Sequence, residues 1–434
     1  MELVKKLDER VAAGNPIKVG IVGCGQMGSG LAHTIGNVKG MQVAAIADID
    51  PERGINTLSE MGHAKKDIIV TDSLPKAEEA LKNNRPLVTS DAFLMTRIND
   101  LEANVEATGV PEIGANVAYQ SIMNHKPIIM LNVETDITVG VYLNNLARKM
   151  GSLYTVASGD EPGVCKMLYE QARLMGFDVV TLGKGKNNPL NHSATPESCR
   201  EEALSKDMNP KMLASFQDGT KTMVEMAAVS NATGLLPDTP GMHGPKVELD
   251  ALADVFISQA DGGIFSKNGC VDYSTGAVAP GVFAIVYSED KRIRKDMKFI
   301  TKADGPYYLH FRPYHLCDME TPQSVAEAVL LNEVTVTAES MYSEVVCRAK
   351  RDLKPGEILG GIGGPDWHGH IMTYTESSAA GAVPIGIGQS SKVTLAIKKG
   401  EVITRDKVVL NQDSFVYKMR EMQDSLMAGG LLNG

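Results

Sequence analysis

Short apolar runs alternate with helical patterns over the first part of the chain. An amphipathic N-terminal pattern predicts a helix, and the apolar run from Ile17 to Val22 predicts a strand. Residues 41–50 predict a second strand. Residues 101–132 predict a strand, a turn with glycine and proline, a helix and a strand, and residues 141–162 add a helix and a strand. Strands that alternate with helices in this way predict a parallel, doubly wound α/β sheet.

Helix and strand patterns are mixed between residues 159 and 340. Residues 163–176 have apolar positions at helical spacing and end in a glycine C-cap, before an apolar strand at 177–183. The Met-rich stripe of 210–238 also has helical spacing and is typical of core packing. The helical pattern at 321–333 begins with Thr-Pro, which predicts an N-cap threonine with proline at the first helical position. We expect this helix to close the second region against the first.

Residues from 341 onward predict a small β domain and a tail. Strand-like runs alternate with the turns Lys354–Glu357 and Lys399–Glu401, and each turn leads into a short apolar strand. A short helical pattern follows about residue 414. The 434 residues therefore predict a doubly wound domain (1–158), an α+β substrate or catalytic domain (159–340) and a β domain with the tail (341–434).

The composition is that of a soluble globular protein and excludes several classes of function. Hydrophobic residues make up 43% of the chain, charged residues 22%, and the formal net charge is -10. An acidic chain lacks the basic face that nucleic acid requires, and no apolar run approaches the roughly 18 residues of a membrane helix. The N-terminus lacks the apolar segment of a signal peptide, and the six cysteines have no C-x-x-C spacing. We expect a cytoplasmic protein with reduced thiols and without a nucleic acid or membrane partner.

A glycine-rich turn lies between the first predicted strand and its helix, where a dinucleotide-binding turn belongs. Gly23 is expected to make the tight turn, Gly25 to let a pyrophosphate approach the backbone, and Gly28 to let helix pack on strand. The helix N-terminus, with Gln26 and Met27, then offers free N–H groups to the phosphates. The first domain is therefore predicted to be a Rossmann domain.

Polar residues follow the predicted strands at one edge of this sheet. Asp48 lies 20 residues after Gly28, where a carboxylate binds the ribose hydroxyls of NAD and repels the 2′-phosphate of NADP. Arg53 lies close by and is able to accept that phosphate, so NAD is favoured and NADP stays open. A single ligand crevice is predicted by the residues at the other strand ends, which are Thr108, Gly109, Asn132, Glu134, Asp160 and Glu161.

Longer motifs make the chain resemble known oxidoreductases. They lie at residues 13–28, 131–140, 158–165, 183–191, 221–238 and 241–246. They resemble a subgroup of the homoserine-dehydrogenase-like oxidoreductases that includes the 1-deoxy-D-xylulose 5-phosphate reductoisomerase-like proteins and the apionate oxidoisomerases. The turns "DLKPGE" and "IKKGEVIT" resemble a SAF (β-clip) domain. The resemblance covers almost the whole chain and implies an NAD(P)-dependent oxidoreductase or reductoisomerase acting on CH–OH groups.

Two positions depart from homoserine dehydrogenases proper. Those enzymes carry an asparagine-lysine pair where this chain has Asn132 and Val133, followed by Glu134. They have an asparagine-glycine-threonine run where this chain has "GKGKNNP". Both changes fall at the substrate, so a sugar acid or sugar phosphate is favoured over homoserine.

The segment "TLGKGKNNPLN", residues 181–191, is the main candidate for a substrate loop. Lys184 and Lys186 follow an apolar strand, and one is able to bind a phosphate or carboxylate while the other polarises a carbonyl. Asn187 and Asn188 are suited to binding hydroxyls. The alternative is a solvated basic turn, since asparagine before proline is a common turn former.

Two pairs of residues are candidates for proton transfer. Asp160 is predicted to cap the helix that follows it, which leaves Glu161 as the functional group. Lys221 and Glu225 lie four residues apart on one helix and form either a surface ion pair or, as the resemblance implies, a catalytic lysine tuned by a carboxylate.

Further candidates come from Thr222 on that helix and from the glycine- and proline-rich stretch after it. Asn231 and His243 are expected in a loop, and His243 is the preferred histidine because it exchanges protons near neutral pH. Arg312, Tyr314 and His315 lie in a polar loop suited to contacting substrate or a second subunit. His368 and His370 lack acidic or cysteine partners nearby in sequence, so a need for a divalent metal stays open.

Together these observations favour an oligomeric NAD(P)-dependent oxidoreductase that acts on a small polyhydroxylated substrate with an anionic group. Homoserine dehydrogenase is the enzyme alternative. The other alternative is a non-catalytic nucleotide-binding sensor or scaffold whose working part is the SAF-like domain.

Overall fold

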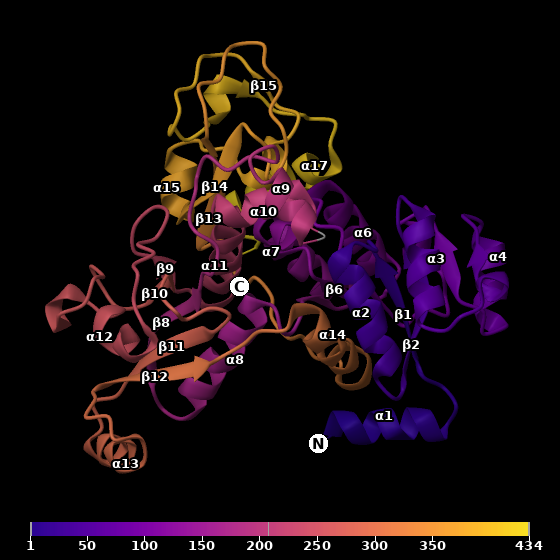
Figure 1. The fold of residues 1–434 in the computed structure, drawn as a ribbon, viewed down its shortest axis with the longest axis horizontal. Helices are drawn as coiled ribbons and strands as arrows, with labels where there is room; N and C mark the ends of the chain where they lie inside the picture. Colours follow the sequence, from indigo (N-terminus) through magenta and orange to yellow (C-terminus); the bar gives the residue numbers. More distant parts are fainter. Residues whose placement is uncertain (1, 207, 433–434) are drawn as a thin grey trace. The chain divides into compact units, whose positions relative to one another are not determined.

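The computed structural model describes residues 2–206 and 208–432, and Figure 1 shows the ribbon. The chain folds into two compact units. Unit 1 contains residues 1–160, 316–338 and 413–434, and unit 2 contains residues 161–315 and 339–412. The residues of the predicted third domain are therefore divided between the two units. The functional division into three domains stays a prediction.

Unit 1 is built on a seven-stranded parallel sheet with the order β3-β4-β2-β1-β5-β6-β7. The order reverses at β1, which makes the crevice beside the carboxyl end of β1 the expected ligand site of a doubly wound sheet. Most strand residues are buried on both faces, as in other parallel sheets covered by helices. The predicted doubly wound α/β fold is confirmed. The strands are β1 (Ile17–Val22), β2 (Met41–Ala47), β3 (Ile69–Val70), β4 (Leu87–Thr89), β5 (Ala103–Glu106), β6 (Ile128–Met130) and β7 (Tyr154–Val156).

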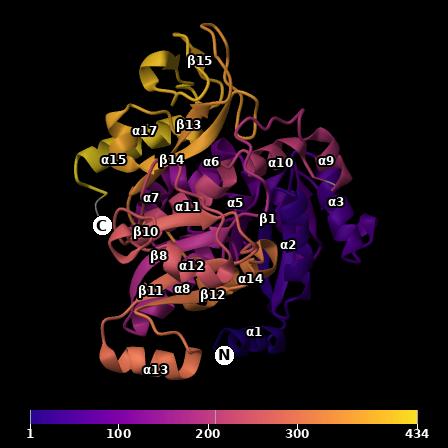
Figure 2. The same ribbon diagram turned by 60° about the vertical axis from the view of Figure 1, so that its left-hand side comes forward.

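The helices of unit 1 come from all three of its chain segments. Figure 2 shows α14, from the middle segment, beside α2. Gly30 permits this approach, because a Cβ there would lie 2.2 Å from a carboxylate oxygen of Asp318. Glu112 binds the backbone N–H groups of Phe415 and Val416 and so fixes the C-terminal helix. The helices are α1 (Glu2–Ala12), α2 (Gln26–Asn37), α3 (Pro51–Glu60), α4 (Leu74–Lys82), α5 (Leu94–Arg97), α6 (Pro111–Met123), α7 (Val133–Met150), α14 (Cys317–Ala326) and α17 (Phe415–Ala428).

The prediction that a helix starts at Thr321 is wrong. Helix α14 begins at Cys317, and Pro322 lies inside it. The Thr321 hydroxyl donates to the Cys317 carbonyl one turn earlier, so the threonine is a helical residue and not a cap. The helix belongs to unit 1, where it packs against α2.

Unit 2 contains a mixed five-stranded sheet with the order β12-β11-β8-β10-β9. Strand β8 is central, antiparallel to β11 and parallel to β10. Helix α8 packs across β8 and β11 (Figure 1). The strands are β8 (Asp178–Gly185), β9 (Leu236–Pro237), β10 (Cys270–Ser274), β11 (Val282–Tyr287) and β12 (Tyr307–Arg312), and the larger helices are α8 (Glu161–Leu174), α9 (Arg200–Ser205), α10 (Pro210–Gln217), α11 (Thr220–Thr233) and α13 (Lys291–Thr301).

The Met-rich stripe of residues 210–238 forms two helices. Gly219 separates α10 from α11 with a φ of +90°, a conformation that glycine adopts without strain. Asn231 lies on α11 and is fully buried, so its expected position in a loop is wrong. Asn231 takes a buried position on this helix. It is tolerated there because its side-chain oxygen accepts hydrogen bonds from two backbone N–H groups.

Residues 339–412 belong to unit 2 and consist mainly of short strands and turns. Strand β13 (Ser343–Ala349) pairs with β14 (Trp367–Thr373), and β15 (Lys392–Val393) pairs with β16 (Val408–Val409). Both predicted turns, Lys354–Glu357 and Lys399–Glu401, are present, with Gly356 and Gly400 at positive φ. Short helices α15 (Tyr374–Ala379) and α16 (Ile385–Gly388) complete the region. Across the described residues, no helix has the length and apolar character needed to cross a membrane.

Candidate active site

Lys184 lies at the end of β8, in the middle of the unit 2 sheet. Its neighbours in register are Tyr273 on β10 and Val282 on β11, and its side chain is buried. The ammonium forms ion pairs with Glu161 and Glu225. Because β8 is covered on both faces, its last residues place a cation inside the unit and not on a solvated turn.

The two carboxylates come from α8, which packs on β8, and from α11, which packs against α8. Glu161 is the first residue of α8, and Glu225 lies in the middle of α11. Both glutamates are buried, with 3% of each residue exposed. Three ionised groups from three elements of unit 2 therefore meet in a volume that excludes most water.

His315 extends this cluster. Its Nε2 lies 3.2 Å from a Glu161 oxygen, and its Nδ1 lies 2.9 Å from the Pro280 carbonyl oxygen. A carbonyl only accepts, so Nδ1 carries hydrogen, and donation from Nε2 to Glu161 requires the imidazolium form. His315 is thus suited to orient Glu161.

Burial and charge act in opposite directions on these groups. Burial alone disfavours the Lys184 ammonium, but the charges of Glu161 and Glu225 outweigh it and raise the Lys184 pKa above its usual range. Burial, followed by the charge of Glu161, raises the pKa of Glu225. The cluster therefore keeps a permanent cation next to a carboxylate of increased basicity.

Lys186 lies two residues further along and is also buried, with 6% of the residue exposed. Its ammonium donates to the Phe216 carbonyl oxygen at 2.7 Å. Burial, assisted by the charge of Lys184, lowers the Lys186 pKa to about 8. Asn187 is exposed and Asn188 half-buried, and they hydrogen bond to each other. The two lysines are thus not a solvated basic turn, whereas the asparagines do face the surface.

Glu225 does not form the predicted surface ion pair with Lys221. Glu225 is buried and pairs with Lys184, a partner that sequence spacing does not reveal. Lys221 is half-buried on the same helix, and its positive charge opposes the rise in the Glu225 pKa that burial causes. Thr222 is buried beside them.

Asn231 and His243 have partners elsewhere in unit 2. The Asn231 side-chain oxygen accepts from the backbone N–H groups of Tyr342 and Ser343, at 2.8 and 2.9 Å. The His243 ring lies 2.8 Å from an Asp238 oxygen. These contacts give both side chains structural partners, and their proposed roles toward substrate stay predictions.

The predicted nucleotide turn of unit 1 has the expected backbone. Gly23 has a φ of +94°, and a Cβ at Gly28 would lie 1.9 Å from the Gly23 carbonyl oxygen. A Cβ at Gly25 would meet no protein atom within 4 Å, which leaves space for a ligand group. Gln26 is exposed and Met27 half-exposed at the start of α2. The turn and the close packing are confirmed, while nucleotide binding stays a prediction.

Asp48 contributes to this turn. One carboxylate oxygen accepts the Cys24 N–H at 2.7 Å and the other accepts the Asp50 N–H at 2.9 Å. Arg53 lies 3.7 Å from Asp50. The carboxylate therefore connects the ends of β1 and β2 at the edge where the dinucleotide is expected.

The other candidates of unit 1 also lie at strand ends. Gly109 has a φ of +65° with open space at its Cβ position. Asn132 caps α7 through the Thr135 N–H, and Glu134 is buried in the first turn of that helix. Asp160 is buried and accepts from the Cys317 thiol at 3.3 Å. Thr108 donates its backbone N–H and its hydroxyl to Glu106.

The positive charge of Lys184 bears on metal binding. Its ammonium pairs with one oxygen of Glu161 and one of Glu225, so a divalent cation bound by those same oxygens would have to displace it. His368 and His370 lie on β14, where burial lowers their pKa values to about 3 and about 4. Both imidazoles are therefore neutral near pH 7, and His368 stacks on His192 with ring centroids 4.4 Å apart.

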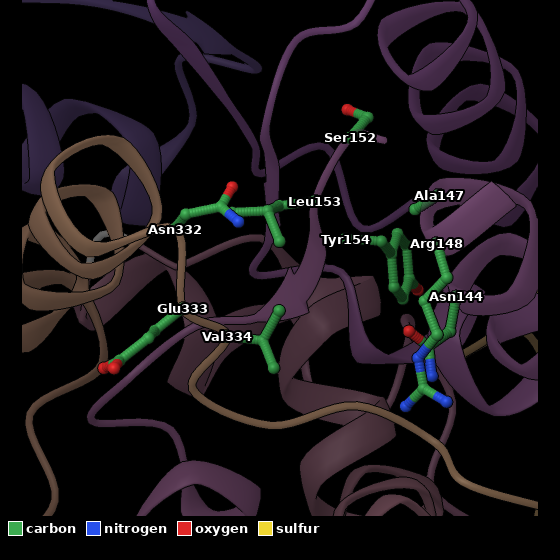
Figure 3. A pocket seen from close by; sticks show the side chains of 9 residues that line it. All are labelled: Asn144, Ala147, Arg148, Ser152, Leu153, Tyr154, Asn332, Glu333 and Val334. Carbon is green, nitrogen blue, oxygen red and sulfur yellow. The ribbon is translucent and has the colours of Figure 1, made fainter. Parts of the chain in front are cut away.

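A separate pocket of about 390 Å³ lies in unit 1. Figure 3 shows Asn144, Arg148 and Tyr154 on one side and the segment Asn332–Val334 on the other. Ser152 and Leu153 precede β7, so the pocket lies at the amino edge of the sheet, opposite the glycine turn. It is not part of the candidate nucleotide site.

Comparison with known proteins supports an oxidoreductase. Residues 159–321 match the family model described as oxidoreductase DRL, catalytic domain. This segment contains Glu161, Lys184, Lys186, Glu225 and His315. No curated protein matches the sequence. The matched segment therefore includes the unit 2 cluster.

Solved structures with a similar fold include a probable dehydrogenase from Thermotoga maritima, with 11% identity, a TM-score of 0.40, and coverage of 73% of this chain and 90% of that one. The scyllo-inositol dehydrogenase from Lactobacillus casei has 13% identity, a TM-score of 0.37, and coverage of 63% and 74%. The 1-deoxy-D-xylulose 5-phosphate reductoisomerase from Zymomonas mobilis has 16% identity, a TM-score of 0.36, and coverage of 50% and 58%.

Proposed function

We propose that the protein is an NAD(P)-dependent oxidoreductase or reductoisomerase that acts on a small polyhydroxylated substrate carrying a carboxylate or phosphate. The observation that carries the proposal is the buried Lys184, held between Glu161 and Glu225 inside the segment that matches an oxidoreductase catalytic domain. A buried cation of this kind is the group that reduction of a carbonyl requires next to the developing alkoxide.

A bound nicotinamide cofactor would supply the hydride chemistry, and the glycine turn of unit 1 would hold it. Gly23, Gly25 and Gly28 shape the turn suited to its pyrophosphate, and the start of α2 offers N–H groups to the phosphates. Asp48 is suited to the ribose hydroxyls, which favours NAD over NADP. These residues belong to unit 1, and Lys184 belongs to unit 2.

Lys184 would polarise the substrate carbonyl and stabilise the alkoxide. Its raised pKa makes it a persistent cation and a poor base, so proton removal falls to a carboxylate. Glu225, with its raised pKa, is suited to accept the proton, and His315 orients Glu161. The same carboxylates are suited to take the proton of a neighbouring hydroxyl, which an isomerisation would need.

Lys186 would bind the anionic group of the substrate. Lys186 is buried beside Lys184, and its ammonium donates to the neutral Phe216 carbonyl oxygen. Its charge is therefore not already cancelled by an ion pair with a carboxylate in the cluster. A carboxylate or phosphate at this place would offset the cost of burying the ammonium. This placement is the reason for preferring an anionic substrate.

The proposal is tested by following the oxidation of NADH and NADPH with three groups of substrates: 1-deoxy-D-xylulose 5-phosphate, branched keto sugar acids, and the aldehyde that homoserine dehydrogenases reduce. We expect turnover with an anionic polyhydroxylated substrate. Lys184→Met should lower kcat by about 10³-fold, and Lys186→Met should raise KM. The matched control is Lys206→Met, which removes an exposed lysine paired with Glu202 on the surface and should change neither constant.

Each contrary result has a distinct meaning. Turnover of the homoserine-related substrate alone would contradict the proposed substrate class. Nucleotide binding without turnover of any substrate would favour the sensor or scaffold alternative. Full activity of Lys184→Met would remove the unit 2 cluster from the reaction.

A further inference from the structure

Glu106 is a buried acid that none of the roles above uses. It is the last residue of β5, the strand beside β1 at the topological switch point of the unit 1 sheet. Its side chain is fully buried. Burying an ionisable group costs folding free energy unless the group is hydrogen-bonded. The hydrogen-bond partners of Glu106 therefore indicate which segments it holds in place.

The first set of partners lies in the loop that follows β5. One Glu106 oxygen accepts the Thr108 N–H at 2.9 Å and also the Thr108 hydroxyl. The Thr108 hydroxyl oxygen in turn accepts the Val110 N–H at 3.2 Å, just before α6 begins. Glu106 therefore fixes the conformation of the whole strand-to-helix loop.

This loop contacts the glycine turn directly. A Cβ at Gly23 would lie 2.9 Å from both the Ala107 carbonyl carbon and the Thr108 nitrogen. The Ala107 N–H also donates to the Val22 carbonyl oxygen at 2.8 Å. A shift of Thr108 would consequently displace the turn that is expected to bind the pyrophosphate.

The second set of neighbours lies on the far side of the carboxyl group. Around Gly114 on α6, an added Cβ would lie 2.3 Å from Thr135 Oγ1, 2.6 Å from Asn132 Nδ2 and 3.0 Å from Glu106 Oε2. The Asn132 amide favours the charged form of Glu106, but these three buried atoms do not form hydrogen bonds of good geometry with one another. The Asn132 and Thr135 side chains thus lie close to the Glu106 carboxyl group around Gly114.

On the basis of the function proposed above, we propose that Glu106 is a positioning residue for the nicotinamide cofactor. Its carboxyl group binds Thr108 and so holds the loop after β5 against the glycine turn, with the Asn132 amide close by. The carboxylate form makes the stronger acceptor for both Thr108 bonds, because hydrogen bonds to a charged oxygen are stronger than those to a neutral one. Protonation of Glu106 weakens the link and lowers cofactor affinity.

The surroundings set the pH range in which this change occurs. Burial raises the pKa of Glu106 to about 7, against the opposing effect of the Thr108 and Asn132 side chains. Glu134 on α7 and Tyr154 on β7 are the titratable groups that interact with it through charge. Glu134 contributes to the upward shift, while the tyrosine hydroxyl, whose own pKa is raised, is neutral throughout this range.

The test is the dissociation constant of NADH, measured by its fluorescence with the full chain at pH values on both sides of about 7. The wild type should bind NADH more weakly as the pH falls. Glu106→Gln keeps an acceptor for Thr108 but cannot titrate, so its constant should not change with pH. Glu106→Ala removes the acceptor and should weaken binding about tenfold at all pH values. Thr108→Val should reproduce the loss seen in Glu106→Ala.

The matched control is Asp136→Asn. Asp136 is the other buried acid of unit 1 whose pKa is raised to about 7 by burial, but it is bound to Tyr154 and not to the cofactor edge. This variant should keep the pH dependence of the wild type. Melting temperatures of all variants separate a folding defect from a binding defect. If Glu106→Ala does not fold, the pH dependence of NADH binding by Glu106→Gln still tests the proposal.

The outcomes also separate this inference from the proposed function. Tight NADH binding with the same pH profile in wild type and Glu106→Gln would overturn the role of Glu106 while leaving the oxidoreductase proposal intact. Absence of NADH and NADPH binding by the wild type would overturn both.

Discussion

Unit 1 buries Glu106 at the end of β5, and unit 2 buries Glu161 and Glu225 around Lys184 of β8. The unit 1 carboxyl group is surrounded by neutral donors, which include the Thr108 N–H and hydroxyl. The unit 2 carboxylates share a lysine. Burial raises the pKa of an acid in both places, but only in unit 2 does an internal cation hold a fixed charge in the site.

This difference indicates different chemical uses. A site that retains a cation at all relevant pH values is suited to stabilise an alkoxide. An acid surrounded by neutral donors is able to change its charge near pH 7 and so to alter the shape of a loop. Four changes test the contrast, and they are described from the largest expected effect to the smallest.

Removal of the cation should have the largest effect. Lys184→Met removes the cation that pairs with both buried glutamates and should lower the free energy of unfolding by about 3–5 kcal/mol. The triple variant Lys184→Met, Glu161→Gln and Glu225→Gln should recover most of that loss, because neutral amides need no counter-charge. Urea unfolding measures both. A loss below about 1 kcal/mol in the single variant would show that the carboxylates are not dependent on Lys184.

At the glycine turn of unit 1, in contrast, the stability should depend mainly on close packing of the backbone. Gly28→Ala places a Cβ 1.9 Å from the Gly23 carbonyl oxygen and should cost about 3 kcal/mol or more of stability. Gly25→Ala is the matched control, since its Cβ meets no protein atom within 4 Å. It should keep the melting temperature of the wild type and lose NADH affinity. Equal melting temperatures for the two variants would contradict this packing.

The second buried acid of unit 1 tests the neutral-donor environment through stability. Burial raises the pKa of Asp136 from 3.8 to about 7. The folded protein then holds a proton that the unfolded chain releases, so this contribution is present below pH 3.8 and is lost as the pH rises through about 7. Asp136→Asn mimics the protonated form and should lose less stability than the wild type between about pH 5 and 8, by on the order of 2 kcal/mol. Parallel stability curves for the two proteins would show that Asp136 is ionised in the fold.

The smallest effect concerns Lys186. Its pKa of about 8 means that the ammonium loses its proton as the pH rises through that value. The KM for an anionic substrate should therefore increase by up to about tenfold above pH 8, with little change in kcat. Lys186→Arg keeps its charge at high pH and should remove that increase. A pH-independent KM in the wild type would exclude Lys186 from substrate binding.

The chain pattern was sufficient for the parts of the fold that depend on local order. The alternation of apolar runs and helical spacing predicts the doubly wound sheet, and Gly23 and Gly28 predict a turn whose φ and close packing are both present. Such features are local, because a strand, a turn and the next helix are contiguous in the sequence. The helix start at Thr321 was wrong because the preceding turn, from Cys317, is also helical and tolerates Pro322.

The sequence predicted only part of the candidate site. Lys184 and Glu161 were selected because polar residues followed apolar strands, and Glu225 was selected as the partner of Lys221. The pairing of Glu225 with Lys184 joins residues 41 positions apart, and the contact of His315 with Glu161 is more distant still. Glu106 was missed, although a single acid at the end of an apolar strand was a usable signal.

The sequence by itself determined which residues form strands, helices and tight turns, since these depend on side-chain spacing and on glycine at positions of positive φ. Only the tertiary structure decided which charges meet. Lys184 becomes a fixed cation, and Glu106 an acid that titrates near pH 7, because burial magnifies the effect of each neighbour. Those neighbours arrive from elements that sequence order does not bring together.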